Sequence, residues 1–140
     1  MVVDTSAVIA ILEAEPEAIR FIETIRGAPD RLMSAASVLE THLVAIHRRG
    51  DDGDAEVELF LARAGIKIVP VTAEHLRVAR DGFLRFGKSR HKAGLNFGDC
   101  FSYALAKATG CPLLFKGNDF GCTDVAVAEI AGLTRRPDCK

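Results

Sequence analysis

Residues 96–120 constrain the fold more than any other part of this 140-residue chain, because a helix and a buried strand lie there between two acidic residues. Asp99 stands at the start of an apolar helical run, where free backbone N–H groups favour a carboxylate. Asp119 follows the apolar run 112–115, which is typical of a fully buried strand. Functional groups of an open parallel sheet gather at the carboxyl ends of its strands, so the pattern predicts a site near Asp119.

Apolar strands and amphipathic helices alternate along the rest of the chain. We predict strands at 1–3, 31–33, 66–69, 112–115 and 123–126, and helices at 7–12, 17–26, 34–46, 54–64, 72–86 and 99–109, with a charged turn at 50–53. This alternation predicts an α/β fold with a mostly parallel central sheet and helices on both faces. The length fits one domain over residues 1–140, and we expect the tail from about residue 132 to be frayed.

Four carboxylates fall on related edges of the predicted sheet: Asp4 ends the first strand, Glu40 lies in the first turns of the following long helix, Asp99 opens the helix before the fourth strand, and Asp119 follows that strand. Carboxylates crowded at one edge repel by about 4 kcal/mol for each close pair, and protons or a cation must offset this. An all-oxygen cluster suits Mg²⁺, or Mn²⁺, better than zinc. Such an ion can orient a hydroxide toward phosphorus, so the implied chemistry is phosphodiester hydrolysis.

Each acid also has a structural explanation. Asp99 and Glu40 could act only on the dipoles of their helices, and Asp119 could merely shape a turn. Asp4 is harder to explain in this way, because an acid at the end of a buried strand needs a partner or a site. Ser6 could cap its helix, or its hydroxyl could hold a metal-bound water in support of the acids.

Basic residues are concentrated between positions 77 and 92, although the formal net charge of the whole chain is only −1. We expect Lys88, Arg90 and Lys92 to contact the phosphates of a polyanionic substrate, which the carboxylates alone would repel. Lys116 is a further candidate, either for phosphate or as a counter-ion to the acids. Phenylalanines 83, 86 and 97 are interleaved with this charge. We expect them to pack in the core rather than stack on bases.

Several motifs together resemble the PIN-domain ribonucleases of the VapC toxin type, namely VVDTSA at the start, SVLE, NFGDCFSYALAKATGCPLLFKGNDF and the following TDV. The resemblance covers nearly the whole chain and implies a three-layer α/β/α fold. It implies a Mg²⁺-dependent endoribonuclease acting on RNA, with tRNA or rRNA as the expected substrate. It also implies the toxin role in a type II toxin–antitoxin pair, a homodimer, and a cognate VapB-type antitoxin as partner.

Carried over position by position, the acids of this family fall on Asp4, Glu40 and Asp99, with Asp4 and Asp99 as the metal ligands. The fourth acidic position is assigned to Asp119. Two alternatives for it stay open, Asn118 beside it and Asp124 after it.

Other functional classes remain open at this point. A non-catalytic RNA-binding or regulatory module could keep the acids as a structural metal site. A phosphatase with an aspartyl nucleophile is disfavoured, because DTSA lacks a second acid two residues after the first. The four cysteines have no close pair, which is poor spacing for zinc. The start has no basic n-region and no run reaches membrane-spanning length, so we expect a cytoplasmic protein without a membrane segment.

Overall fold

The structure, a computed structural model, describes residues 1–133, so almost all of the tail expected to be frayed lies outside the described residues. The elements in chain order are β1 (Val2–Val3), α1 (Thr5–Leu12), α2 (Ala18–Gly27), β2 (Leu32–Ser34), α3 (Ala35–Ala64), β3 (Lys67–Val69), α4 (Ala73–Phe86), α5 (Phe97–Thr109), β4 (Leu113–Leu114) and the short 3-10 helix η1 (Phe120–Cys122).

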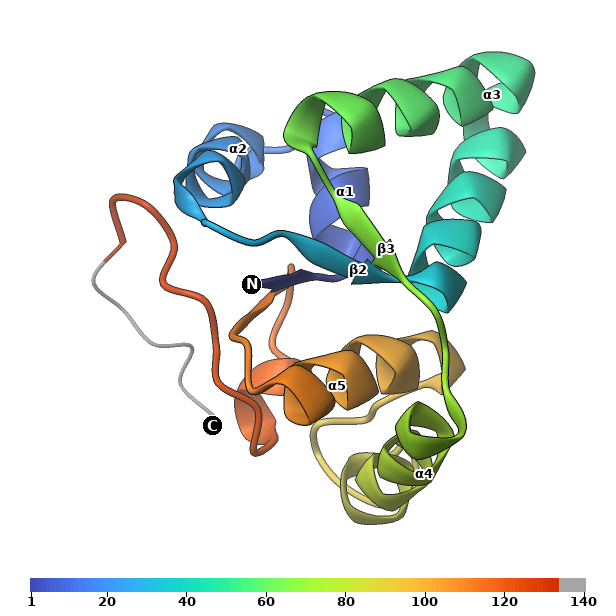
Figure 1. Ribbon diagram of the computed structural model, residues 1–140, viewed down its shortest axis with the longest axis vertical. Coiled ribbons are helices and arrows are strands. Elements are labelled where there is room, and N and C mark those ends of the chain that lie inside the picture. The colour runs from blue at the N-terminus through green and yellow to red at the C-terminus, as the bar shows by residue number, and fades with distance from the viewer. Residues whose placement is uncertain (134–140) are drawn as a thin grey trace.

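The four strands form one sheet in the order β3-β2-β1-β4, and every pair is parallel. Val2 pairs with both Leu32 and Leu113, which places β1 between β2 and β4. Helices α1, α2 and α3 cover one face of the sheet, and α4 and α5 cover the other (Figure 1). The predicted three-layer α/β/α fold with a parallel central sheet is therefore confirmed.

The core lies on both faces of the sheet, as the short apolar strands require. Successive strand residues point to opposite faces. Val3, Met33 and Leu114 accordingly pack in the cluster under α1, α2 and α3. Val2 and Leu113 pack in the cluster under α5. Within residues 1–133, no helix combines the length and the apolar composition that crossing a bilayer would require.

The strand order places a topological switch point between β1 and β4. From β1 the chain moves outward to β2 and β3, then crosses back through α4 and α5 to pair β4 with the other side of β1. Asp4 directly follows β1, and its backbone N–H donates to the Leu114 carbonyl at 2.9 Å. Ligands of open α/β sheets bind in the crevice at such a point, outside the carboxyl ends of the strands. Asp4 is therefore built into the position where a site is expected.

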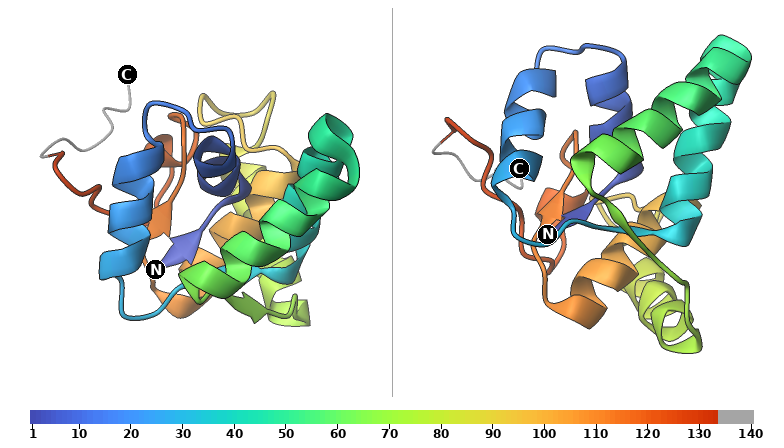
Figure 2. Two further views of the ribbon diagram at one scale, coloured as in Figure 1. Left: turned by 90° about the horizontal axis from the view of Figure 1, so that it is seen from above. Right: turned by 45° about the horizontal axis from the view of Figure 1, so that its top comes forward.

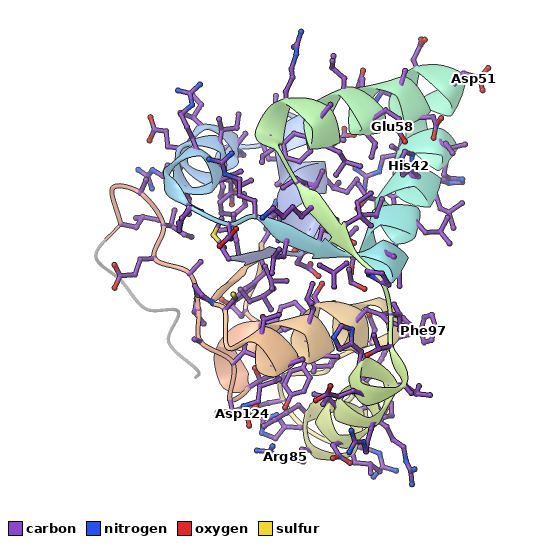
Figure 3. All side chains as sticks on the ribbon, viewed as in Figure 1. His42, Asp51, Glu58, Arg85, Phe97 and Asp124 are labelled. Atoms are coloured by element: carbon purple, nitrogen blue, oxygen red, sulfur yellow. The ribbon has the colours of Figure 1, made fainter. Side chains whose placement is uncertain are left out.

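The long helix α3 consists of two arms, residues 35–49 and 51–64, that meet at Gly50 (Figure 2). Gly50 has φ 60° and ψ −142°, so the predicted break at 50–53 is confirmed but is limited to one residue. A Cβ at Gly53 would lie too close to the Ala45 backbone, so this glycine allows the arms to approach. His42 joins them, with Nδ1 at 2.6 Å from Asp54 and Nε2 at 3.3 Å from Glu58 (Figure 3).

The strand predicted at 123–126 is wrong. The nearest bridge is an isolated one between Leu113 and Val127, one residue beyond the predicted segment. The Thr123 hydroxyl donates to the Phe120 carbonyl at 2.7 Å and accepts from the Val125 N–H at 3.4 Å. Such local side-chain bonds to the backbone compete with the ladder bonds of a sheet, and here they keep the segment turned.

Candidate active site

Asp4 is a buried carboxylate held by three hydrogen bonds; the residue is only 4% exposed. Its Oδ1 accepts from the Ser102 hydroxyl at 2.6 Å. Its Oδ2 accepts from the Ser6 N–H at 2.9 Å and from the Ser6 hydroxyl at 2.6 Å. The bond from the Ser6 N–H makes Asp4, and not Ser6, the N-cap of α1. A carboxylate offers about four acceptor positions. Asp4 is therefore rigidly oriented and retains capacity for one further partner, such as a cation.

Ser6 connects Asp4 to the strand beside it. The Ser6 Oγ donates to Asp4 and accepts from the backbone N–H of Lys116 at 3.0 Å. Lys116 follows the end of β4, so one hydroxyl ties together the two chain segments that leave the switch point. Sequence analysis assigned Ser6 a supporting position, and the structure places its hydroxyl against the carboxylate that it would support.

Asp99 lies at the third position of α5 and forms a capping box with Asn96. The Asn96 Oδ1 accepts from the Asp99 N–H, and the Asp99 Oδ2 accepts from the Asn96 N–H, both at 2.9 Å. This reciprocal pair satisfies two donors that the helix start would otherwise leave free. It uses one oxygen of Asp99 and fixes the direction of the carboxylate.

The pKa of Asp99 is raised from its ordinary value of 3.8 to about 6. Burial is the largest cause, the hydrogen bond from the Asn96 backbone opposes it, and the nearby charges of Asp4, Asp119 and Glu40 raise the pKa further. The structure thus brings Asp4, Asp119 and Glu40 within electrostatic reach of Asp99. A positive charge among them would relieve the repulsion.

Glu40 reaches this cluster from α3 and rests on the start of α5. Its carboxylate lies against Gly98, where an added Cβ would come within 2.8 Å of the Glu40 Cδ. Within the described residues Glu40 makes no hydrogen bond or ion pair, so its oxygens are available to another ligand. Asp119 lies on the exposed turn just before η1.

Asp124, one alternative for the fourth acid, is engaged elsewhere. It accepts from the Tyr103 hydroxyl at 2.8 Å and from Arg85 at 3.0 Å, and Lys107 lies 3.3 Å away. Burial tends to raise its pKa, but these three hydrogen-bonding partners prevail and lower the pKa below its usual value. Figure 3 shows Asp124 and Phe97 at opposite ends of α5. Because Asp99 is two residues from Phe97, Asp124 lies away from the acidic cluster.

Lys88, Arg90 and Lys92 project from the loop 87–95, which leads into the N-terminus of α5. Main-chain bonds close the loop, from the Lys88 N–H to the Leu95 carbonyl at 2.8 Å and from the Leu95 N–H to the Phe86 carbonyl at 3.0 Å. All three cationic side chains are exposed, and none forms an ion pair within residues 1–133. They are therefore free to meet an anionic ligand.

Lys116 differs from these three, because its ammonium group is already paired. It contacts the Glu15 carboxylate and lies 3.9 Å from that of Glu17. Lys116 is thus a counter-ion to the loop after α1, and a phosphate would have to compete with two carboxylates for it.

Two buried serines around Asp4, Ser37 and Ser102, were not predicted from the sequence. Ser102 donates to Asp4, and its hydroxyl lies 3.2 Å from that of Ser37. Each serine is one helical turn from an acid, Ser37 before Glu40 and Ser102 after Asp99, and residues three apart share a helix face. That spacing was the available signal.

Phe97 was expected in the core, and this expectation is wrong. Phe97 is 80% exposed, and its ring forms an edge-to-face contact with Phe101, with ring centroids 5.0 Å apart. It occupies the first position of α5, where the helix face toward the sheet is already taken by the buried residues that follow.

The donor set of the cluster fits a hard divalent cation. Within residues 1–133 no three histidine, cysteine, aspartate or glutamate side chains converge into a ready-made metal cage. Mg²⁺ does not require one, because it keeps several waters and is usually held by one or two carboxylates plus substrate phosphates. Asp4 and Asp99, with all-oxygen donors and an unrelieved repulsion, match that requirement.

Several known proteins are similar to this chain over most of its length. The PIN domain family model matches residues 1–126. Ribonuclease VapC30 of Mycobacterium tuberculosis is 51% identical over 130 residues, covering 93% of this chain and 99% of the relative. Ribonuclease VapC of Mycolicibacterium smegmatis is 52% identical over 129 residues, covering 92% and 100%.

A solved structure with a similar fold is that of Mycobacterium tuberculosis VapC20, described as a sarcin-ricin loop cleaving toxin. It has a TM-score of 0.71 at 19% identity and covers 89% of this chain and 95% of its own. At that identity the likeness supports the fold alone. The family model and the sequence relatives show that the chain belongs to the PIN-domain family and, within it, to the VapC-type toxin ribonucleases.

Proposed function

We propose that this protein is the toxin of a type II toxin–antitoxin pair and acts as a Mg²⁺-dependent endoribonuclease. The observation that carries the proposal is the gathering of Asp4, Asp119 and Glu40 around the partly buried Asp99, with Asp4 at the carboxyl end of β1. A chain of VapC type that gathers four acids at a topological switch point is suited to phosphodiester hydrolysis. We place the activity in the cytoplasm, where the RNA is.

Asp4 and Asp99 would hold the cation, with Mn²⁺ as a possible replacement for Mg²⁺. When bound, the ion would activate water and neutralise charge on the phosphoryl oxygens. Ser102 and Ser6 keep the Asp4 carboxylate in one orientation by donating to both of its oxygens. Glu40, whose oxygens make no hydrogen bond in the described part of the chain, would accept a proton from the attacking water. Asp119 would complete the acidic rim.

The substrate would be a structured RNA, with tRNA or rRNA as the expected class. The exposed cations of the loop 87–95 lie next in sequence to α5 and would hold the phosphate backbone while the acids act on one phosphodiester. Lys116 would take part only after exchanging Glu15 for a phosphate.

Replacing Lys88, Arg90 and Lys92 by alanine should weaken RNA binding and make it less sensitive to salt. Each lost phosphate contact on a single strand flattens the slope of log K against log salt by about 0.7, so the triple variant should lose about 2. The slope is measured with the Asp99→Asn protein to prevent cleavage. Arg20→Ala, an exposed arginine of α2 on the other face of the sheet, is the control. An unchanged slope in the triple variant would remove this loop from the binding surface.

The antitoxin would dock over a cavity of about 280 Å³ between α1, α2 and the second arm of α3. Its apolar wall includes Ile11, Ile22 and Phe60, and the guanidinium groups of Arg26 and Arg63 also line it. Within residues 1–133 neither arginine forms an ion pair. An amphipathic segment with an apolar anchor and adjacent acidic residues would match this surface.

A homodimer would bury the exposed apolar face of α3. Leu39, Leu43 and Ile46 are 59%, 57% and 41% exposed and share one helix face. Exposed Phe97 comes from α5, which contacts α3 where Glu40 meets Gly98. Apolar patches of this kind mark association surfaces, and the commonest symmetric solution is a two-fold dimer.

Leu43→Asp should convert the dimer into a monomer, because it places a charge in the middle of this apolar face. Light scattering after size exclusion measures the mass. Leu76→Asp is the matched control, since Leu76 is 65% exposed on α4. A monomeric wild-type protein, or a dimer that survives Leu43→Asp, would contradict this interface.

Induced expression followed by mapping of new RNA 5′ ends tests the function as a whole. Wild type should generate new ends at a few defined sites. The Asp99→Asn protein should generate none, and co-expression of the cognate antitoxin should suppress them. A folded wild-type protein that generates no new ends, in cells or with purified RNA and Mg²⁺, would favour the non-catalytic RNA-binding alternative.

A further inference from the structure

Gly98 occupies the second position of α5, directly before Asp99, and Glu40 covers it. An alanine Cβ built there would lie 2.8 Å from the Glu40 Cδ and 3.0 Å from Oε1, with Oε2 closer still. Contacts under 3.0 Å are essentially absent for real Cβ atoms. A side chain at position 98 and the present position of the Glu40 carboxylate therefore exclude each other.

The backbone does not explain the glycine. Gly98 lies within a regular helix and does not have the left-handed φ that L side chains avoid. Glycine is a poor helix former compared with alanine, because it loses more conformational freedom on folding. Gly98 therefore lowers the stability of the helix. What its missing side chain provides is the space that the Glu40 carboxylate fills.

The position that Glu40 thereby reaches has two electrostatic consequences. The carboxylate lies at the helix N-terminus, where the first backbone N–H groups have no partner inside the helix. It also lies close enough to Asp99 for its charge to raise the pKa of that residue. Because Gly98 has no side chain, Glu40 of α3 can closely approach Asp99 of α5.

We propose that Gly98 is a positioning residue that holds the Glu40 carboxylate in its working place beside Asp99. The inference rests on the proposed ribonuclease function. Gly98 touches neither substrate nor cation in this account and acts only through Glu40. An added methyl group should push the Glu40 carboxylate away from α5, while Asp4 and Asp99 keep their own hydrogen bonds.

Gly98→Ala should lower kcat for RNA cleavage by about a hundredfold, the lower end of what a positioned acid or base contributes, and leave KM nearly unchanged. The proton-accepting group would be displaced, whereas the loop that holds the RNA would not. Gly27→Ala is the matched control, because Gly27 ends α2 with no atom within 4 Å of an added Cβ and an ordinary φ. That variant should cleave like wild type.

Two double variants separate positioning from a general disturbance of α5. Gly98→Ala combined with Glu40→Asp should be more active than Gly98→Ala alone, because the shorter acid no longer meets the methyl group. In a Glu40→Ala background, Gly98→Ala should cause no further loss of activity. The thermal midpoint gives a readout independent of activity, since Gly98→Ala should raise it more in the Glu40→Ala background than in wild type.

Full activity in Gly98→Ala, or equal losses from Gly98→Ala with and without Glu40, would overturn the proposal. If Gly98→Ala does not fold, the double variant Gly98→Ala/Glu40→Ala still tests the proposal. A double variant that is also unfolded would contradict the role of Glu40. If wild type and Gly27→Ala both fail to cleave RNA, the proposed function fails. The thermal comparison still decides whether the two residues are coupled.

Discussion

Asp99→Asn is expected to lower RNA cleavage by about a thousandfold, comparable to the loss of a principal transition-state contact. The same change should stabilise the protein in metal-free buffer at neutral pH. Activity falls because a cation ligand is lost. Stability rises because the acid is held near Asp4, Asp119 and Glu40 in a half-buried position that disfavours its charge. The asparagine oxygen can still accept from the Asn96 N–H, so the capping box survives.

The sign of the stability effect follows from the pKa. In the folded protein Asp99 keeps its proton up to about pH 6, whereas its ordinary pKa is 3.8. The unfolded chain therefore loses this proton first as pH rises. The contribution of Asp99 to stability is fully present below about pH 4 and is lost between about pH 4 and 6. Since the Asp99 carboxyl is partly exposed, we expect this contribution to the free energy of unfolding to be about 1 kcal/mol after allowing for solvent screening.

Thermal unfolding in EDTA across pH 4 to 8 measures this effect. The advantage of Asp99→Asn should be absent near pH 4 and complete above pH 6, and Mg²⁺ should reduce it by stabilising wild type. Asp51→Asn is the matched control, because Asp51 lies exposed at the bend of α3 (Figure 3). Unchanged cleavage by a folded Asp99→Asn protein, or a loss of stability at pH 7, would contradict the assignment.

Most of the fold was predictable because apolar periodicity reports directly on burial. The runs that became β1 and β4 are uniformly apolar, and both faces of the sheet bury them. The strand prediction for 123–126 was wrong because the backbone conformation of this segment depends on one hydroxyl. Thr123 bonds to the Phe120 carbonyl, and nothing in a period-two pattern distinguishes that threonine from one facing a neighbouring strand.

The gathering of the acids was predictable for a topological reason, since the carboxyl ends of parallel strands share one edge of the sheet. The pKa of Asp99 agrees with that expectation, although the catalytic roles of the acids stay predictions. Partners distant in sequence were not predictable. Lys116 meets Glu15 about a hundred residues away, and Ser102 meets Asp4 across a similar separation.

Asp4→Asn should also lower RNA cleavage by about a thousandfold. Unlike Asp99→Asn, however, it should destabilise the protein. Both Asp4 oxygens accept hydrogen bonds, from Ser102 on one side and from the Ser6 N–H and hydroxyl on the other. An asparagine supplies one oxygen and one NH₂ group, so when its oxygen serves Ser6 its NH₂ group faces Ser102, whose hydroxyl must then accept instead of donate, in a site that is only 4% exposed. Removing the carboxylate charge from three hydrogen bonds in this buried site should cost about 2 kcal/mol.

Urea unfolding of Asp4→Asn and Asp99→Asn in EDTA at pH 7 compares these signs directly. Asp4 anchors the switch point through neutral donors, so removing its second oxygen breaks bonds that fold the protein. Asp99 contributes a charge that folding disfavours, so neutralising it relieves a repulsion. Both variants should be inactive while their free energies of unfolding move in opposite directions from wild type. Changes of the same sign would mean that one of the two carboxylates is not held in the environment described for it.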